Sequence, residues 1–146
     1  MCKKYNFFDF SIEVKDDCDY NEIVFLNIME QSLGEGYTLH KTLHPFCNVD
    51  YRLDYEGIVV GFIELKVRES LKNYSSIKIG EVKLNVISQH YRKTIFVWLC
   101  LDTNKLYFCK YSDDLLLCNK NRNTYEIDKK LCSVGLNELV NVCRDW

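Results

Sequence analysis

The chain has 146 residues, a formal net charge of −2, 47% hydrophobic residues and 27% charged residues. These values are typical of one soluble globular domain and exclude a disordered chain. No apolar run approaches the ~20 residues that cross a bilayer, and no signal-peptide pattern opens the chain. We therefore expect a single domain over residues 1–146 and an intracellular location, cytoplasmic, or nuclear in a eukaryotic or viral setting.

The first half of the chain predicts a helix and then a strand hairpin. Residues 20–33 repeat apolar side chains at helical spacing, and glycines follow them. Residues 48–55 and 58–67 read as two strands joined by a Glu56-Gly57 turn. The second strand, IVVGFIELKV, is apolar on both faces, which predicts a central strand covered by helices.

The second half predicts a helix, a second hairpin and a closing amphipathic helix. The expected segments are a short strand or extended loop at 75–79, a helix at 81–91, a hairpin of 94–102 and 105–111, a further strand at 115–118, a turn at 119–123 and a helix at 134–146. The order of helix, hairpin, helix, hairpin, helix indicates an α/β layer fold with a mixed sheet.

Charge is unevenly distributed along the chain. Residues 1–60 carry five basic and eleven acidic side chains, residues 61–93 carry seven basic and three acidic, and residues 94–146 carry seven of each. A local positive field beside carboxylates suits a metal-dependent enzyme that acts on phosphates. An ordinary solvated surface explains so small an excess equally well.

The eight cysteines include no CxxC pair. Structural zinc sites need closely spaced pairs, so we expect reduced cysteines, although the count also allows a disulfide framework. The stretch HKTLHPFC holds His40, His44 and Cys47. Pro45 disfavours a helix there and no fourth ligand is near, which argues against a zinc site.

The hairpin places charges among apolar side chains. Alternation along a strand puts Glu64 and Lys66 on one face, while Asp50 and Asp54 share a face of the other strand. Pairing would bring one of these aspartates close to Glu64, and a divalent cation would relieve the repulsion between the carboxylates. Mg²⁺ commonly binds one or two carboxylates plus waters, and the Leu65 carbonyl could add a ligand. Lys66 could orient a water or neutralise developing charge.

The pattern D-x13-E-x-K across a hairpin, behind a helix that bears a glutamate, resembles the PD-(D/E)xK nuclease superfamily. Within it, the hairpin is similar to those of archaeal-type Holliday junction resolvases and of type I restriction nuclease modules. The resemblance covers about residues 20–111. It implies a restriction-endonuclease-like three-layer core, in which a mixed central sheet is flanked by helices. It also implies that Asp50 and Glu64 bind Mg²⁺ or Mn²⁺, that Lys66 assists the water and that Glu22 supports the site.

The resemblance further implies a structure-specific endonuclease that hydrolyses DNA and pairs into a homodimer, with no membrane partner and no organic cofactor. The residues implied as DNA contacts are Arg68, Lys72, Lys78, Lys83, Gln89, Arg92 and Lys93. Val49 stands where the superfamily name has proline, and Asp54 competes with Asp50. Two other classes stay open: a catalytically inactive module on the same fold that binds nucleic acid or a protein, and an inhibitory protein whose acidic first 60 residues dock a basic partner.

Overall fold

The structure is a computed structural model that describes residues 3–7, 10–14, 18–42, 49–70 and 76–146. The helices in these ranges are α1 (Cys18–Leu33), α2 (Glu81–His90), α3 (Leu136–Arg144) and the 3-10 helices η1 (Asp113–Leu117) and η2 (Lys129–Leu131). The strands are β1 (Lys3–Phe7), β2 (Phe10–Val14), β3 (Tyr37–Lys41), β4 (Tyr51–Tyr55), β5 (Ile58–Arg68), β6 (Ser76–Gly80), β7 (Thr94–Cys100), β8 (Lys105–Lys110), β9 (Asn119–Asn121), β10 (Thr124–Asp128) and β11 (Ser133–Val134).

A mixed six-stranded sheet forms the centre of the fold, in the order β11-β8-β7-β5-β4-β3. Strands β5 and β7 run parallel, and every other neighbouring pair in this sheet is antiparallel. A smaller sheet has the order β6-β10-β9, and β1 pairs with β2 separately. A parallel pair needs a crossover, and the chain between β5 and β7 supplies one through β6 and α2.

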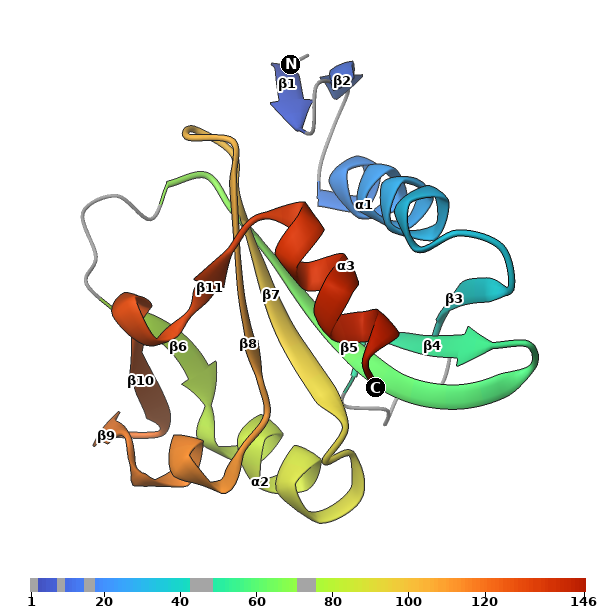
Figure 1. Cartoon of the computed structure of the whole chain (residues 1–146). Coiled ribbons are helices and arrows are strands. Elements are labelled where there is room, and N and C mark those ends of the chain that lie inside the picture. Colours follow the sequence, from blue (N-terminus) through green and yellow to red (C-terminus); the bar gives the residue numbers. More distant parts are fainter. Residues whose placement is uncertain (1–2, 8–9, 15–17, 43–48, 71–75) are drawn as a thin grey trace.

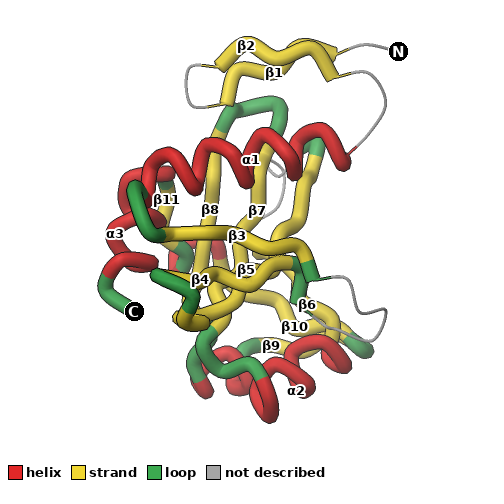
Figure 2. Tube along the Cα trace, turned by 90° about the vertical axis from the view of Figure 1, so that its right-hand side faces the viewer, coloured by secondary structure: helices red, strands yellow, loops and turns green. Residues whose placement is uncertain are grey.

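The two faces of the central sheet have different covers (Figures 1 and 2). Helices α1 and α3 pack together on one face over a cluster that includes Phe25, Met29 and Leu139. On the other face, α2 and the smaller sheet enclose a second cluster that includes Leu84 and Trp98. Figure 2 shows α1 across the upper part of the molecule, α3 at its left side, and α2 with β6, β9 and β10 in the lower part. The fold is therefore an α/β protein in layers, as the sequence predicts.

Local patterns account for the main elements. Phe25, Met29 and Leu33 recur every fourth residue in α1, so they share the face that packs on the sheet. Every residue of β7 is buried, as expected for a strand covered on both sides. The Glu56-Gly57 turn has φ values of 50° and 81°, which match a two-residue hairpin turn with positive φ at both positions.

Two of the predicted segments are wrong. Residues 115–118 do not add a strand: η1 spans Asp113–Leu117, anchored by the buried side chain of Leu115. Residues 119–123 are not only a turn, because β9 occupies Asn119–Asn121 and pairs with β10 around Arg122, whose φ is 57°. The three polar residues of β9 are all exposed, so no apolar alternation marks this strand in the sequence.

Candidate active site

A buried glutamate lies on the face of β5 that is covered by α2. Its neighbours Ile63 and Leu65 belong to the cluster under α1 and α3. Because side chains alternate along a strand, Glu64 and Lys66 face the other way, where both line one cavity. Only 1% of Glu64 is exposed. A carboxylate this deeply buried costs free energy unless cations or hydrogen-bond donors compensate for the lost water.

A β-bulge brings Asp50 opposite this glutamate. The pairing of β4 with β5 shifts by one residue next to Asp54. Beyond the shift, Tyr51 pairs with Ile63, and the same register continued by one residue puts Asp50 opposite Glu64. Without the shift, Asp50 would lie opposite Ile63 and its side chain would point to the other face of the sheet. The bulge therefore places both carboxylates on the cavity side.

Three hydrogen bonds fix Asp50 at the start of β4. Its backbone carbonyl accepts from the Thr42 amide at 2.9 Å and from the Thr42 hydroxyl at 3.0 Å. Its carboxylate oxygen Oδ2 accepts from the Leu65 amide at 2.8 Å. This last bond ties the side chain directly to β5, one residue past Glu64. Asp50 is thus held by β3 and β5 together.

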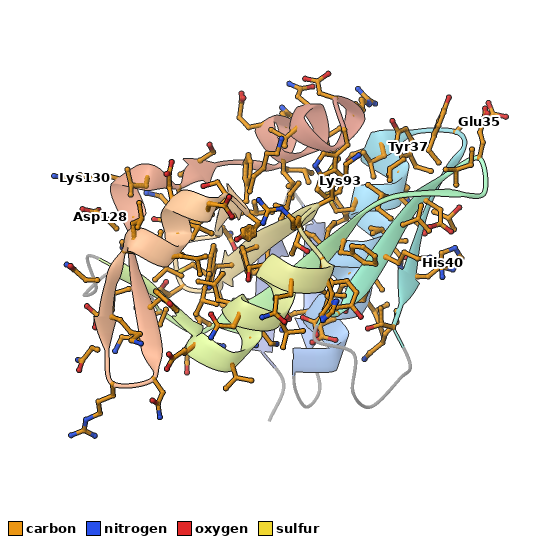
Figure 3. The ribbon with its side chains drawn as sticks, turned by 90° about the horizontal axis from the view of Figure 1, so that it is seen from below. Glu35, Tyr37, His40, Lys93, Asp128 and Lys130 are labelled. Atoms are coloured by element: carbon orange, nitrogen blue, oxygen red, sulfur yellow. The ribbon has the colours of Figure 1, made fainter. Side chains whose placement is uncertain are left out.

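Asp54, the competing aspartate, lies near the hairpin turn in an ion-paired group of its own. Arg52 donates to both of its oxygens, at 2.9 and 3.0 Å. His40 Nε2 lies 3.4 Å from Asp54 Oδ2. Figure 3 shows His40 on the outer strand β3, on the opposite side of the molecule from Asp128 and Lys130. Of the two aspartates, the structure puts Asp50 beside Glu64.

The Glu64 carboxylate lies between a cationic and an acidic neighbour, Lys83 and Asp50. Lys83 Nζ, from α2, lies 2.7 Å from Glu64 Oε2. Neither carboxylate oxygen accepts a hydrogen bond of good geometry from the residues that the structure describes. Burial and the adjacent Asp50 together raise the pKa of Glu64 to about 8, against the opposing effect of Lys83. Glu64 is therefore a buried carboxylate whose nearest cation only partly stabilises its charge.

The two lysines beside Glu64 have pKa values shifted in opposite directions. Burial and the positive charge of Lys83 lower the pKa of Lys66, although Glu64 and Asp50 act against this shift. Burial alone would also lower the pKa of Lys83, but its contacts with Glu64 and the charge of Asp50 raise it overall. Lys83 is consequently the lysine that holds its proton more strongly, and Lys66 the one that gives it up more readily.

These side chains open into a cavity of about 370 Å³ between the central sheet, α2 and the smaller sheet. Its cationic lining comes from β5, β6 and α2, and its apolar wall consists of Phe96 and Trp98, which stack on each other in β7. Gly80 and Thr124 of β10 also line the cavity. The cationic residues are Lys66, Arg68, Lys78 and Lys83. A cavity with this lining suits a phosphate group that approaches the two carboxylates.

Glu22 lies apart from this group. Its Oε2 accepts a hydrogen bond from the Tyr51 hydroxyl at 3.0 Å and lies 3.6 Å from Lys41 Nζ. Tyr51 belongs to the cluster under α1 and α3, so these contacts are on the other face of the sheet from Glu64. The structure therefore does not bring Glu22 into contact with the two carboxylates.

The remaining expected DNA contacts are divided between two places. Arg68, Lys78 and Lys83 line the cavity. Gln89, Arg92 and Lys93 instead line a second groove of about 380 Å³, formed by the end of α2 and the start of β5. Arg92 there donates to both oxygens of Asp113, at 3.0 and 2.9 Å. Lys72 lies outside the described residues.

Among the described residues, no group of three or more His, Cys, Asp and Glu side chains is arranged to hold a metal ion. His44 and Cys47 of the stretch HKTLHPFC lie outside the described residues, so its zinc-binding capacity is not defined. Five cysteines within the described ranges are free thiols: Cys100, Cys109, Cys118, Cys132 and Cys143. This agrees with the expectation of reduced cysteines for that part of the chain.

Two features of the site were not anticipated from the sequence. Lys83 was expected to contact DNA, whereas it forms an ion pair with Glu64. The sequence signal for this role is the position of Lys83 in the first turn of α2. This helix belongs to the crossover between β5 and β7, so its first turn can lie over the face of β5 that carries Glu64. The aromatic wall was not among the expected site residues, and Phe96 and Trp98 are 2% exposed each. Their contribution to the cavity depends on the parallel pairing of β5 with β7, which the sequence did not specify.

No protein-family model, no curated protein and no solved structure matches this chain. Within the described ranges, no helix combines the length and the apolar character needed to span a membrane. A function can therefore be proposed only from the residues of the chain and the geometry of the site.

Proposed function

We propose that the chain is a metal-dependent nuclease of the restriction-endonuclease-like, PD-(D/E)xK type that hydrolyses phosphodiester bonds in DNA. One observation carries the proposal: the bulged hairpin sets Asp50 beside Glu64, and Glu64 and Lys66 line a cavity together with further cationic side chains. Two carboxylates and a lysine held on neighbouring strands can, together with a divalent cation, position a phosphodiester and stabilise the charge that develops on it.

The residues fit a divalent cation. Both oxygens of Glu64 are buried and lack a well-oriented donor among the described residues, which is the condition that a cation would relieve. Asp50 and Glu64 would hold Mg²⁺ or Mn²⁺, with waters completing the shell, because Mg²⁺ usually keeps several waters beside one or two carboxylates. When bound, such an ion would acidify a water and offset negative charge on the phosphate.

The other cavity residues have separate roles in this proposal. Lys66 Nζ would donate to the attacking water or to a phosphate oxygen, and its lowered pKa suits proton movement at this atom. Arg68 and Lys78 would bind flanking phosphates from the cavity edge. Lys83 would balance the charge of the two carboxylates when no phosphate is bound.

A second candidate is a catalytically inactive module with the same fold that binds nucleic acid. The specific observation in its favour is the 2.7 Å ion pair in which Lys83 already occupies one oxygen of Glu64. A lysine that permanently neutralises the carboxylate would preserve the fold and exclude a divalent cation. The cationic cavity would then bind phosphates without hydrolysis.

A cleavage assay tests the proposal. Purified protein is incubated with branched, duplex and single-stranded DNA in the presence of Mg²⁺, Mn²⁺ or EDTA. We expect metal-dependent cutting that falls by about 100-fold or more in Asp50→Asn and Lys66→Ala, because each removes a group that stabilises the transition state. Asp114→Asn and Lys105→Ala, exposed and outside the cavity, are the matched controls and should cut like the wild type.

Cation binding separates the two candidates without reference to cutting. Calorimetric titration with Mn²⁺ should show binding to the wild type that is lost in Asp50→Asn. Binding of DNA with neither cutting nor Mn²⁺ uptake would replace the nuclease by the inactive module. Cutting that Asp50→Asn and Lys66→Ala leave intact would refute the assignment of the site.

A further inference from the structure

Three partly buried cysteines that do not line the cavity gather at the edge of the central sheet. Cys109 is in β8, Cys118 follows η1 and Cys132 precedes β11. All three pack against the cluster on the α2 side of the sheet. Each is a free thiol of intermediate exposure, whereas Cys100 and Cys143 are buried. Small thiol reagents can therefore reach these three more easily than the other two.

The strand register sets two of these cysteines directly against each other. In the antiparallel pair of β11 with β8, Ser133 lies opposite Phe108 and Val134 lies opposite Tyr107. The same register continued by one residue puts Cys132 opposite Cys109. Directly opposed residues of an antiparallel pair point to the same face, which agrees with the shared packing of both thiols.

The hydrogen bonds identify the kind of pair that these cysteines form. The Gly135 amide donates to the Leu106 carbonyl at 2.9 Å, so these two residues form a hydrogen-bonded pair. Opposed pairs alternate along an antiparallel ladder between hydrogen-bonded and non-hydrogen-bonded types. Cys109–Cys132 lies three pairs further along and is therefore a non-hydrogen-bonded pair. In agreement, the Cys132 amide donates to Lys129 at 3.0 Å. Non-bonded pairs have Cα atoms about 4.5 Å apart, which lies inside the range of about 4.4–6.8 Å that disulfides span. This type of strand pair therefore admits a disulfide.

The two thiols are also chemically unequal. A hydrogen bond from Cys132 lowers the pKa of the Cys109 thiol despite its burial. The same bond, together with burial and the charges nearby, raises the pKa of Cys132. The thiolate is the form of cysteine that attacks a disulfide, so the lowered pKa favours Cys109 as the attacking thiol.

We propose that Cys109 and Cys132 are a redox-active pair that forms a cross-strand disulfide by exchange with a small disulfide such as oxidised glutathione. The Cys109 thiolate attacks one sulfur of oxidised glutathione, forms a mixed disulfide and releases one glutathione thiolate, which takes up a proton. The Cys132 thiol then loses its proton and attacks Cys109 Sγ, releasing the second glutathione. The chain loses two thiol protons and two electrons, and one oxidised glutathione becomes two reduced ones.

The disulfide would close a segment that contributes to the cavity wall. The chain between the two cysteines contains η1, β9 and β10. Strand β10 carries Thr124, which lines the cavity, and pairs with β6, which carries Lys78. A covalent link at the ends of this segment restricts the unfolded chain and so raises the melting temperature of the oxidised protein.

The test is disulfide mapping of the folded full-length chain. The protein is equilibrated with glutathione at increasing ratios of oxidised to reduced form, alkylated at low pH and digested with trypsin. Trypsin releases Cys109 in the peptide 106–110, Cys118 in 111–120 and Cys132 together with Cys143 in 131–144. We expect a linked product of peptides 106–110 and 131–144, and fragment-ion sequencing should place the link on Cys132. A link to Cys118 or Cys143, or glutathione retained on Cys109 without a link, overturns the proposal.

Matched variants make the assignment independent of the peptide map. Cys118→Ser removes the third thiol of the same group and should form the link as the wild type does. Cys132→Ser should stop at the mixed disulfide and retain one glutathione on Cys109. If Cys132→Ser fails to fold by circular dichroism, the map of the wild type still decides. A chain that keeps both thiols at every glutathione ratio contradicts the pair.

Discussion

Glu64 combines two requirements that oppose each other. Function, as proposed, needs an ionised carboxylate, whereas burial favours the neutral acid. Its pKa of about 8 shows that burial and Asp50 together outweigh the opposing effect of Lys83. A bound divalent cation would reverse that balance by favouring the charged form. The ionised form of Glu64 is thus unfavourable in the folded protein without a cation, and this is why a bound cation would be stabilised there in the proposed function.

This conflict predicts a pH dependence of stability. In the unfolded chain Glu64 titrates near 4.5, and in the folded protein near 8. Between these values the folded protein keeps a proton that the unfolded chain has released, so stability falls as the pH rises. We expect the difference between Glu64→Gln and the wild type to shift in favour of the variant from pH 5 to pH 8, by up to about 1.4 kcal/mol per pH unit. The measurement is urea unfolding of both proteins across this range, without divalent cations.

Glu81→Gln is the matched control for the change of acid to amide. Glu81 also pairs with a lysine, Lys120, at 2.8 Å, but both side chains remain partly exposed to water. If Glu64→Gln and Glu81→Gln give the same pH profile, the burial of Glu64 does not govern its proton affinity.

At the level of elements, the bulge in β5 is the feature that decides the site. A two-residue turn with regular pairing would set Asp50 opposite Ile63, on the wrong face for Glu64. The sequence identified both strands and both carboxylates, but the one-residue shift that unites them follows no residue pattern in the hairpin. The residue types point to the candidate site, whereas the strand register that brings them together could not be predicted from them.

Other elements show the same limit. The three α-helices, the β4–β5 hairpin and the β7–β8 hairpin lie where apolar periodicity predicted them. Strand β3 lies in a stretch for which the sequence predicts no strand, and β9 has only polar residues. Both are short edge strands that gain their structure by pairing with a neighbour rather than from an apolar face. Local patterns do not report such pairing.

Gly61, next to the bulge, permits a close contact with the end of the chain. A Cβ atom at this position would overlap the ring of Trp146, which packs against the cluster under α1 and α3. We expect Gly61→Ala to displace the Trp146 ring and to lower the free energy of unfolding by about 1–3 kcal/mol, the usual cost of overpacking. Chemical denaturation measures the loss, and the emission maximum of tryptophan should move to longer wavelength.

Gly80→Ala serves as the control for this substitution. A Cβ there meets no atom within 4 Å, and its φ of −61° is open to any residue. An equal loss of stability in both variants would show that the contact with Trp146 does not explain the effect at Gly61.

On the scale of the whole molecule, the fold gives the two faces of the sheet different tasks. The face under α1 and α3 is closed by aliphatic and aromatic side chains and supplies stability. The face under α2 and the smaller sheet leaves a cavity, and the basic part of the sequence, residues 61–93, supplies its cations. Basic residues that are separated along this part of the sequence thereby lie close together in space, near Glu64 and Asp50.

If the chain binds DNA as proposed, this arrangement predicts which lysines contact it. Lys78 lines the cavity and Lys93 lines the second groove, and both are exposed. If DNA enters the cavity, Lys78→Ala should weaken binding and reduce the slope of log K against log salt by about one, because one phosphate contact is lost. Lys93→Ala should change neither quantity. Fluorescence anisotropy with labelled duplex DNA in EDTA, over a range of salt concentrations, measures both. A larger loss for Lys93→Ala would place the DNA over the second groove, and the cavity would then have to admit the scissile phosphate from the α2 end.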